Sequence, residues 1–226
     1  MKVLVIVPAY NEEAIIAETI RNIREKAPGT DILAVNDGSA DRTEEILRED
    51  GVGHLRLSIN LGIGGAVQSG YLYADRHGYD YAVQIDGDGQ HDPSYIWPMI
   101  RHMEAEGADL CIGSRFIENK GFQSSAPRRA GIRFLSALTR LLCGVLIRDV
   151  TSGYRVANRR TIGIFAEEYS DDYPEADSIP EVIRQGGKVI EYPVVMRERT
   201  TGRSSIGPVR SLYYMIKVSI SILNHL

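Results

Sequence analysis

Apolar and polar segments alternate regularly along the first half of the chain. Strands are predicted at residues 2–7, 32–35, 54–59, 81–85 and 108–112, and the first is a continuous apolar run of the kind found in strands buried on both faces. Helices are predicted between them, over residues 13–26, 41–48, 65–77 and 93–106; in the first, Ile16, Ile20 and Ile23 recur at helical spacing. Repeated strand–helix units predict an α/β fold, with a mostly parallel twisted sheet and helices on both faces.

The composition is that of a folded protein of ordinary polarity, since 43% of the 226 residues are hydrophobic and 25% are charged. No long low-complexity linker or internal repeat interrupts the chain, so we expect one domain with a C-terminal extension. Cys111 and Cys143 lack metal-like spacing and are predicted to be buried thiols in a reducing compartment. The apolar run that ends at Pro8 is too short for a signal peptide or a membrane span, so we expect an intracellular protein.

Charge is unevenly distributed between the two halves. Residues 1–119 carry 10 Lys and Arg against 20 Asp and Glu, a net −10, whereas residues 120–226 carry 16 against 10, a net +6. An acidic half suits a cation, and a basic half suits phosphate or an anionic membrane surface. The charge count alone also fits a chance distribution of solvated side chains.

Polar clusters follow three of the predicted strands, at residues 8–13, 36–43 and 86–92. Ligands of parallel α/β sheets bind beyond the carboxyl ends of the strands, so these clusters predict a site. Asp86-Gly87-Asp88 follows a buried strand directly, and two hard oxygen ligands suit Mg²⁺ or Mn²⁺ bridging the diphosphate of a nucleotide donor. Gln90 and His91 are close enough in sequence to join the ligands. Acidic turns with glycine are common in loops, but this position favours a metal site.

The two earlier clusters offer contacts for a nucleotide. Asp37 is placed to accept hydrogen bonds from a base or ribose, or to form only an Asx-turn and helix cap. Tyr10 can flank a planar base and Glu12 can bond a base or ribose. Alternatively, Asn11 caps the following helix and Glu12 favours its dipole, and capping does not preclude ligand contact. The glycines around Gly64 lack the spacing of a dinucleotide loop; close approach to a ligand or tight helix packing fits them better.

Seven segments in order resemble the family 2 glycosyltransferases with the GT-A fold, and most closely their polyprenyl-phosphate, dolichyl-phosphate mannosyltransferase-like branch. They are VPAYNEE, VNDGSADRT, NLGIGGAVQSGY, QIDGDGQHDP, GSRF, DVTSGYR and RERTTGRSS, and they run from Val7 to Ser205. The resemblance implies an inverting, metal-dependent hexosyltransferase. The donor would be a UDP- or GDP-linked sugar, and the acceptor would be undecaprenyl or dolichyl phosphate. The enzyme would be associated peripherally with the cytoplasmic face of the membrane. A small membrane-protein partner and the oligomeric state stay open, and no nucleic acid is expected.

The resemblance also implies roles for individual residues. The metal would be held by Asp86, Asp88 and Gln90. The donor nucleotide would contact Pro8, Ala9, Tyr10, Glu12, Asp37, Gly64, Asp86, Gly87, Asp88, Arg199 and Arg203. The acceptor phosphate would lie at Arg115, Arg129, Arg133 and Ser204. The residues nearest the chemistry would be Asp86, Asp88, Arg115, Glu175 and Asp177, with no general base assigned because a phosphate acceptor is already anionic.

The resemblance divides the chain into a GT-A domain, residues 1–205, and a C-terminal amphipathic helix, residues 206–226. Residues 1–119 would hold donor and metal, and residues 120–205 the acceptor. An amphipathic helix is predicted near 128–146, where Arg129, Arg133 and Arg140 share a face. Leu135, Leu138, Leu142 and Val145 lie around that face. Such a helix can lie in a membrane interface, or it can simply pack on the core.

Several alternatives remain at this point. The acceptor could be a hydroxyl of a glycan or small molecule in cell-envelope polysaccharide synthesis. A nucleotidyltransferase is disfavoured because PAYNEE replaces the glycine-rich basic loop of that class, and a non-catalytic module is disfavoured by intact Asp86, Asp88 and Gln90. Gly202 is the expected pivot of a cationic loop in which Arg203 stands where many relatives have lysine. Asp149 and Arg155 are expected to shape the pocket floor, although helix capping accounts for Asp149 equally well.

Overall fold

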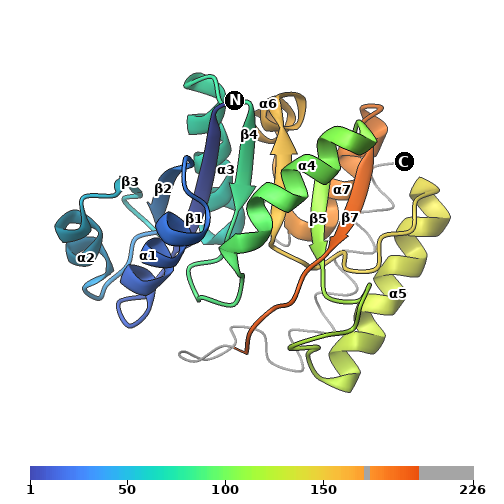
Figure 1. Cartoon of the computed structure of the whole chain (residues 1–226), viewed down its shortest axis with the longest axis horizontal. Helices are drawn as coiled ribbons and strands as arrows, with labels where there is room; N and C mark the ends of the chain where they lie inside the picture. Colours follow the sequence, from blue (N-terminus) through green and yellow to red (C-terminus); the bar gives the residue numbers. More distant parts are fainter. Residues whose placement is uncertain (171–173, 199–226) are drawn as a thin grey trace.

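The structure is a computed structural model that describes residues 1–170 and 174–198. In that part of the chain, seven strands form one sheet in the order β3-β2-β1-β4-β6-β5-β7 (Figure 1). The strands are β1 (Val3–Ala9), β2 (Asp31–Asn36), β3 (Gly53–Arg56), β4 (Tyr81–Gln84), β5 (Leu110–Ser114), β6 (Arg155–Asn158) and β7 (Val189–Pro193). The helices are α1 (Ile16–Lys26), α2 (Thr43–Asp50), α3 (Gly62–Arg76), η1 (Pro93–Tyr95), α4 (Ile96–Glu106), α5 (Ala126–Cys143), α6 (Arg159–Glu167) and α7 (Pro174–Arg184).

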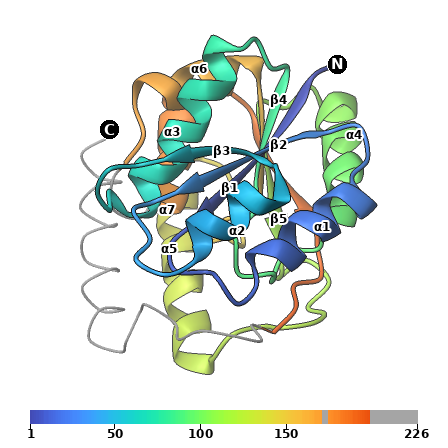
Figure 2. The ribbon, with the colours of Figure 1, turned by 90° about the vertical axis from the view of Figure 1, so that its left-hand side faces the viewer.

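Helices cover both faces of the sheet, as predicted (Figure 2). The alternation of side chains along β1 explains why both faces must be covered: Leu4 and Ile6 enter one core, while Val5 and Val7 enter the other. The first core is completed by buried residues of α3, α5, α6 and α7. The second is completed by residues of α1, α2 and α4. The α/β architecture expected from the sequence is confirmed.

The sheet is parallel except at β6, which pairs antiparallel with both β4 and β5. The register sets Gln84 at the end of β4 opposite Arg155 at the start of β6. Because β6 runs in the opposite direction, its first residues lie at the same edge of the sheet as the carboxyl ends of β1 and β4. This strand therefore brings a segment from the second half of the chain to the predicted site.

The chain reverses its direction across the sheet between β1 and β4. From β1 it proceeds outward through β2 to β3, and it then returns to add β4 on the other side of β1. A crevice forms at such a switch point, outside the carboxyl ends of the two strands. The polar clusters after β1 and β4 both lie there.

The predicted elements of the first half are present with shifted ends. β3 stops at Arg56, before the expected residue 59, and α3 begins at Gly62 rather than 65. The helix expected near 128–146 is α5, which begins at Ala126 and ends before Gly144, a left-handed residue with φ 74°. Within the described residues, no helix is long and apolar enough to cross a membrane.

Candidate active site

The loops that follow β1 and β2 are bonded to each other along their length. The backbone N–H of Asn11 donates to Ser39 Oγ at 3.0 Å, and Asn11 Oδ1 accepts from the N–H of Ala40 at 2.9 Å. Glu12 donates its backbone N–H to Thr43 Oγ1 at 2.9 Å. The expectation that Asn11 caps α1 is therefore wrong: its side chain bridges two loops, and α1 begins five residues later. These bonds join residues 10–13 and 37–43 into one rim at the carboxyl ends of β1 and β2.

Asp37 connects these two loops to a third loop, which follows β3 and leads into α3. Its carboxylate accepts the backbone N–H groups of Leu61 at 2.7 Å and Gly62 at 2.9 Å, at the start of α3. The carboxylate is thus the cap of a helix that is distant in sequence, while the nearby Asn36 Oδ1 accepts the backbone N–H of Ser39, three residues on, at 3.0 Å. Capping and ligand contact are compatible, because each carboxylate oxygen has more than one lone pair. The contact with a base or ribose stays a prediction.

The rim presents apolar side chains to solvent beside this acidic residue. Tyr10 is 50% exposed, and Ile59, Leu61 and Ile63 in and after the third loop are 67%, 48% and 41% exposed. Pro8, Ala9 and Gly64 are buried beneath them. An exposed aromatic ring beside aliphatic side chains suits the flat face of a nucleobase. The sequence indicated Tyr10 but not the three aliphatic residues.

The loop after β4 packs closely against the first rim. A Cβ atom on Gly87 would lie 2.9 Å from the carbonyl oxygen of Pro8, so only glycine fits between the two loops. Thr19 Oγ1 on α1 donates to the carbonyl of Gly87 at 3.1 Å. Asp88 is 8% exposed, and its Oδ1 accepts the backbone N–H of Gln90 at 3.0 Å. Asp86 is the more exposed of the two carboxylates, with 35% of its side chain accessible.

His91 lies under this loop and is 6% exposed. Its Nδ1 accepts the backbone N–H of Asp86 at 3.2 Å, and its ring stacks on Tyr154, with centroids 5.0 Å apart. Burial lowers the pKa of His91 to about 4, against the opposing charge of Asp88 and with the help of Arg115. A buried neutral ring whose Nδ1 is already bonded supports the loop from behind, so the sequence-based suggestion that His91 joins the metal ligands receives no support from this geometry.

The residues present fit a hard divalent cation. Two carboxylates and one amide are too few for a closed protein cage, and the described residues contain no group of three or more His, Cys, Asp or Glu side chains that could form one. Mg²⁺ and Mn²⁺ sites of nucleotide enzymes need only one or two carboxylates, because substrate phosphates supply further ligands. A Cβ on Gly153 would lie 3.0 Å from both carboxylate oxygens of Asp86 and 3.2 Å from the unbonded amide nitrogen of Gln84, so glycine keeps a small polar space open there.

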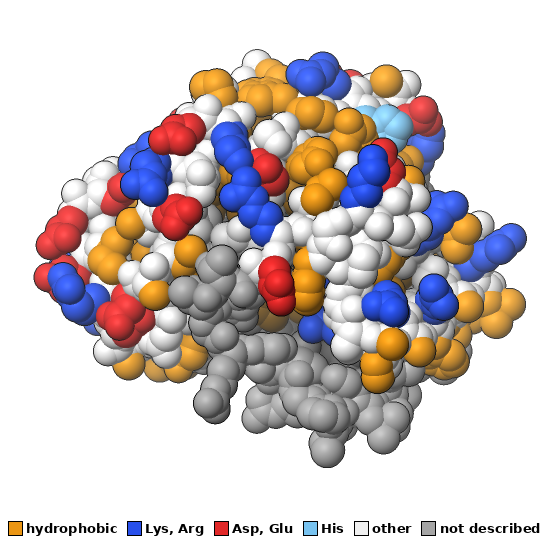
Figure 3. All heavy atoms as spheres, turned by 60° about the horizontal axis from the view of Figure 1, so that its bottom comes forward, with side chains coloured by type: hydrophobic (Ala, Val, Ile, Leu, Met, Phe, Trp, Pro, Cys, Tyr) orange, Lys and Arg blue, Asp and Glu red, His pale blue; other side chains and the backbone are white. Residues whose placement is uncertain are grey.

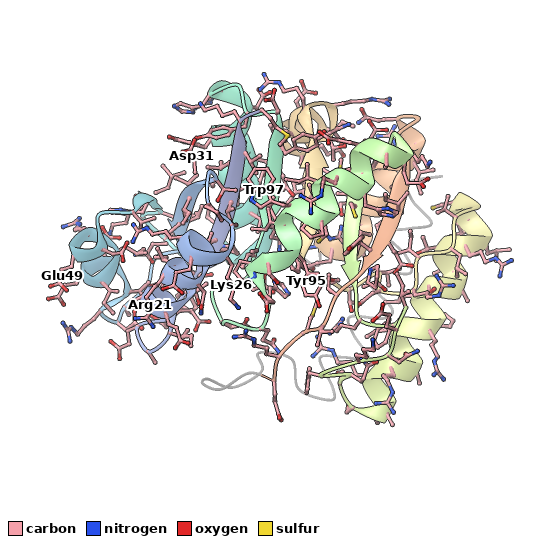
Figure 4. The ribbon with its side chains drawn as sticks, in the orientation of Figure 1. Arg21, Lys26, Asp31, Glu49, Tyr95 and Trp97 are labelled. Atoms are coloured by element: carbon pink, nitrogen blue, oxygen red, sulfur yellow. The ribbon has the colours of Figure 1, made fainter. Side chains whose placement is uncertain are left out.

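Two cationic side chains form ion pairs with Asp92, at the end of the loop after β4. Lys26 on α1, labelled in Figure 4, lies 3.1 Å from Asp92 Oδ1. Arg197, beyond β7, lies 3.3 Å from Asp92 Oδ2. Partial burial would raise the pKa of Asp92, but the Ser94 hydrogen bonds and Lys26 lower it. Gln90 and Arg197 also exchange two hydrogen bonds: Arg197 N donates to Gln90 O at 2.9 Å, and Gln90 Nε2 donates to Arg197 O at 3.2 Å. Gln90 thus links the loop to the segment that leads into the predicted cationic loop.

Arg115 lies at the end of β5 and is 8% exposed. Its Nε and Nη2 each donate to the carboxylate of Asp149 at 2.7 Å, and its backbone N–H donates to the same carboxylate at 3.0 Å. Asp149 is fully buried and receives support from Glu191, whose Oε1 accepts the Asp149 backbone N–H at 2.9 Å. Helix capping by Asp149 is therefore wrong, because its carboxylate holds Arg115 instead. The expectation that Asp149 shapes the floor of a pocket stays a prediction. A contact between Arg115 and phosphate stays a prediction.

Arg155 is fully buried at the start of β6 and links three segments. Its guanidinium donates to the carbonyls of Ser152 and Val150 and to Ser178 Oγ, and it also bonds the carbonyl of Glu175. This places the first turn of α7 at the carboxyl edge. Burial raises the pKa of the Glu175 carboxyl, Arg155 opposes this, and nearby Asp86 raises it further.

The two acidic residues of α7 consequently differ. Glu175 is close enough to Asp86 for their charges to interact. Asp177 is 6% exposed and accepts a hydrogen bond from Ser170 Oγ at 2.8 Å. The structure therefore brings Glu175 to the predicted metal loop and ties Asp177 to the segment before α7. Their part in acceptor binding stays a prediction.

The arginines of α5 lie beside the same edge. Arg129 Nη1 donates to the carbonyl of Ser124 at 2.7 Å, and the neighbouring Gln123 Nε2 donates to the carbonyl of Arg115 at 3.1 Å. The loop before α5 thus connects Arg115 to Arg129, while Arg133 is exposed one turn further on. Arg199, Arg203, Ser204 and Gly202, together with residues 206–226, lie outside the described residues.

The apolar face assigned to α5 from the sequence needs correction. Leu135 is buried in the core, and Leu138, Leu142 and Val145 are partly buried against it, so these residues hold the helix on the core. The apolar side chains that α5 exposes are instead Phe134, 52% exposed, and Leu141, 79% exposed. Helical periodicity alone could not tell which of the two apolar stripes faces the core.

Together, a mostly parallel sheet and an acidic loop at its switch point have the architecture of the GT-A class of glycosyltransferases. Residues 4–163 match the family described as glycosyl transferase family 2. The chain therefore belongs to glycosyl transferase family 2, as the sequence motifs indicated.

The chain is similar to several curated proteins over most of its length. It is 30% identical to the polyprenol monophosphomannose synthase of Mycolicibacterium smegmatis, over 96% of this chain and 86% of that protein. It is 30% identical to the undecaprenyl-phosphate mannosyltransferase of Micrococcus luteus, over 91% and 88%. It is also 30% identical to the UDP-N-acetylglucosamine–dolichyl-phosphate N-acetylglucosaminyltransferase of Methanococcus voltae, over 74% and 73%.

Among solved structures, the fold is similar to glucosyl-3-phosphoglycerate synthase from Mycobacterium tuberculosis. The crystal structure of that enzyme with Mn²⁺, UDP-glucose and phosphoglyceric acid has a TM-score of 0.71 and 20% sequence identity, covering 99% of this chain and 79% of the other. The likeness confirms the GT-A fold.

Proposed function

We propose that this protein transfers a hexose-type sugar from a nucleoside diphosphate to a polyprenyl phosphate at a membrane surface. The observation that carries the proposal is the convergence, at one edge of the sheet, of an acidic loop suited to a metal-bound diphosphate and a basic region formed by Arg115 and the start of α5. Three relatives at 30% identity are named for transfer to polyprenyl, undecaprenyl or dolichyl phosphate, which supports this acceptor class.

The donor side is built from the bonded loops after β1, β2 and β3 and from the loop after β4. Asp37 and Glu12 hold the nucleoside end, and the exposed ring of Tyr10 covers the base. A divalent cation at Asp86, Asp88 and Gln90 would neutralise the diphosphate as it leaves. The crystal structures of the fold neighbour contain Mn²⁺ with UDP or UDP-glucose, in support of a divalent cation here.

The reaction is a single displacement at the anomeric carbon. An oxygen of the acceptor phosphate forms the new bond from the face opposite the diphosphate, and the diphosphate leaves with the bonding pair, so the anomeric configuration inverts. The acceptor is already anionic at neutral pH and needs no general base. Arg115, held in place by Asp149, and Arg129 at the start of α5 shield its charge and orient it.

The outer face of α5 suits contact with an anionic membrane. The helix contains four arginines and no acidic residue. Figure 3 shows Lys or Arg side chains next to hydrophobic side chains on the side of the molecule where α5 lies in Figure 1. Phe134 and Leu141 can enter the interface while Arg133 and Arg140 meet lipid phosphates. The enzyme would thus meet its lipid substrate at the cytoplasmic surface of the membrane.

A transfer assay tests this function directly. Purified protein is incubated with a panel of radiolabelled UDP- and GDP-sugars, Mn²⁺ or Mg²⁺, and undecaprenyl or dolichyl phosphate in detergent or vesicles. We expect label in the lipid phase with at least one donor, none after chelation, and none with Asp88→Ala, whose fold is checked by circular dichroism. Absence of lipid product with every donor would contradict the proposed acceptor, and unchanged turnover by Asp88→Ala would contradict the metal site.

A soluble phosphorylated acceptor is the second candidate. It is favoured by one observation, that the fold neighbour was crystallised with phosphoglyceric acid in the acceptor role its name describes. The same assay therefore includes 3-phosphoglycerate and neutral glycans in parallel. Label transferred only to 3-phosphoglycerate would replace the lipid assignment while leaving the donor side unchanged.

A further inference from the structure

The loop from Asp86 to Asp92 is closed by two contacts that use neither of its metal-binding carboxylates. At its start, the backbone N–H of Asp86 donates to His91 Nδ1 at 3.2 Å. At its end, Tyr154 donates its hydroxyl to the carbonyl oxygen of Asp92 at 2.9 Å. The two rings stack on each other at an interplanar angle of 17°. One aromatic pair therefore spans both ends of the loop.

Both rings are shielded from water, with His91 6% and Tyr154 0% exposed. Water cannot readily replace these hydrogen bonds, so losing either leaves a buried backbone group without a partner. The loop must then shift to satisfy the group, and the carboxylate of Asp86 shifts with it.

The ring of His91 also borders the side chain of Asp86. Because Nδ1 accepts a backbone N–H, the proton of the neutral ring is on Nε2, which lies 3.8 Å from Asp86 Oδ2. Behind the same carboxylate, Gly153 leaves the space that a Cβ would fill at 3.0 Å. Consecutive residues of one segment, Gly153 and Tyr154, thus act on both the carboxylate and the loop that carries it.

We propose that His91 and Tyr154 are positioning residues for the divalent cation, holding the loop so that the carboxylates of Asp86 and Asp88 face one point. Mutation of residues that orient metal ligands typically weakens metal affinity about 10- to 100-fold. The inference rests on the proposed function only for the presence of a divalent cation, since no acceptor takes part.

Conservative variants separate positioning from simple core packing. In His91→Asn the amide oxygen can occupy the place of Nδ1 and accept the N–H of Asp86, whereas in His91→Gln the amide lies nearer the place of Nε2. Tyr154→Phe keeps the stacked ring and loses only the bond to Asp92. Tyr79→Phe is the matched control, because Tyr79 is also buried, at 4% exposure, and its hydroxyl donates at 2.9 Å to Asp31 far from the loop.

The readout is Mn²⁺ affinity of the purified full chain, measured from the free-ion electron paramagnetic resonance signal with saturating UDP and, in a second series, GDP. We expect His91→Gln to weaken Mn²⁺ binding about 10- to 100-fold. His91→Asn should retain most of the affinity, Tyr154→Phe should fall between them, and Tyr79→Phe should match wild type. A pure packing role predicts instead that affinity follows thermal stability in all four variants.

Three results would overturn the inference: unchanged affinity in His91→Gln, a loss in Tyr79→Phe as large as in Tyr154→Phe, or no Mn²⁺ binding by wild type with either nucleotide. Normal Mn²⁺ binding without transfer to any polyprenyl phosphate would contradict the acceptor assignment and leave the inference intact.

Discussion

Arg115 and Asp149 form a buried, bidentate ion pair, with Nε and Nη2 of the arginine each 2.7 Å from a carboxylate oxygen of the aspartate. The pair joins the end of β5 to the segment after α5, which are 34 residues apart in sequence. Both partners are buried, so the pair holds the guanidinium of Arg115 in one place just after the end of β5. The same pair lies near enough to His91 to affect its pKa, so it also borders the loop that carries Asp86 and Asp88.

Breaking this pair from the aspartate side should destabilise the protein. Asp149→Asn removes the negative charge and leaves a buried guanidinium without its counterion, which costs about 3 kcal/mol of unfolding free energy. Denaturant unfolding followed by circular dichroism measures the change. The control is Asp75→Asn, which disrupts the exposed pair of Asp75 with Arg159 at 3.5 Å and should change stability by less than about 1 kcal/mol. Equal effects of the two variants would show that burial of the Arg115 pair is unimportant.

The same variant should affect the acceptor more than the donor. Because Asp149 orients the guanidinium that is proposed to meet the acceptor phosphate, its loss should raise the acceptor KM about 10-fold or more in the protein that remains folded. The donor KM should change little. Steady-state kinetics with each substrate varied in turn tests this, and a change confined to the donor KM would place Arg115 on the other side of the site.

A side chain at Gly153 should disturb Asp86. In Gly153→Ala the new Cβ would lie 3.0 Å from both carboxylate oxygens of Asp86, so the carboxylate must shift from its present position. We expect a loss of metal-dependent transfer of about 10-fold or more with little change in stability. Gly163→Ala is the control, because nothing lies within 4 Å of a Cβ there and alanine favours the helix. Full activity of Gly153→Ala at limiting Mn²⁺ would contradict the tight fit.

The sequence predicted the strands and helices of the first half because each carries its own signal. Val3–Ala9 is buried along its whole length, and the isoleucines of α1 lie on one face, so local pattern and burial agree. It did not predict β6, α6, α7 or β7. β6 is a four-residue strand whose antiparallel place between β4 and β5 depends on pairing with distant residues. No local pattern encodes that pairing.

Some residues of the candidate site could likewise be predicted from local sequence, whereas others depend on contacts between distant segments. Asp86, Asp88 and Asp37 could be predicted because they follow strands whose carboxyl ends meet at one edge. Tyr154, Lys26 and Arg197 were missed as partners of the metal loop, because their contacts span 62, 66 and 105 residues. The DVTSGYR motif was the one available signal for Tyr154, and it marked the segment without showing what the ring touches.

The two cysteines should differ in reactivity, and neither should be activated. Burial raises the pKa of the Cys111 thiol to about 12, with Glu191 adding to the effect, and burial also raises the pKa of Cys143. At pH 8 both thiols are therefore protonated, and thiolate, the reactive form, is scarce. Iodoacetamide should label half-buried Cys143 slowly and Cys111 only after unfolding, as followed by mass spectrometry. Rapid labelling of Cys111 in the native protein would mean that its strand opens readily.

The outer face of α5 should govern membrane binding. Phe134→Ser with Leu141→Ser removes two exposed apolar side chains, and we expect affinity for phosphatidylglycerol vesicles to fall about 10-fold or more. Arg133→Glu with Arg140→Glu should abolish the preference for phosphatidylglycerol over phosphatidylcholine, and high salt should do the same in the wild type. Ile59→Ser is the control, because Ile59 is 67% exposed and follows β3 instead. Vesicle sedimentation measures all of these. If the α5 variants bind as wild type does, the membrane contact lies elsewhere on the protein, and the leucines that hold α5 to the core are the whole explanation of its amphipathic sequence.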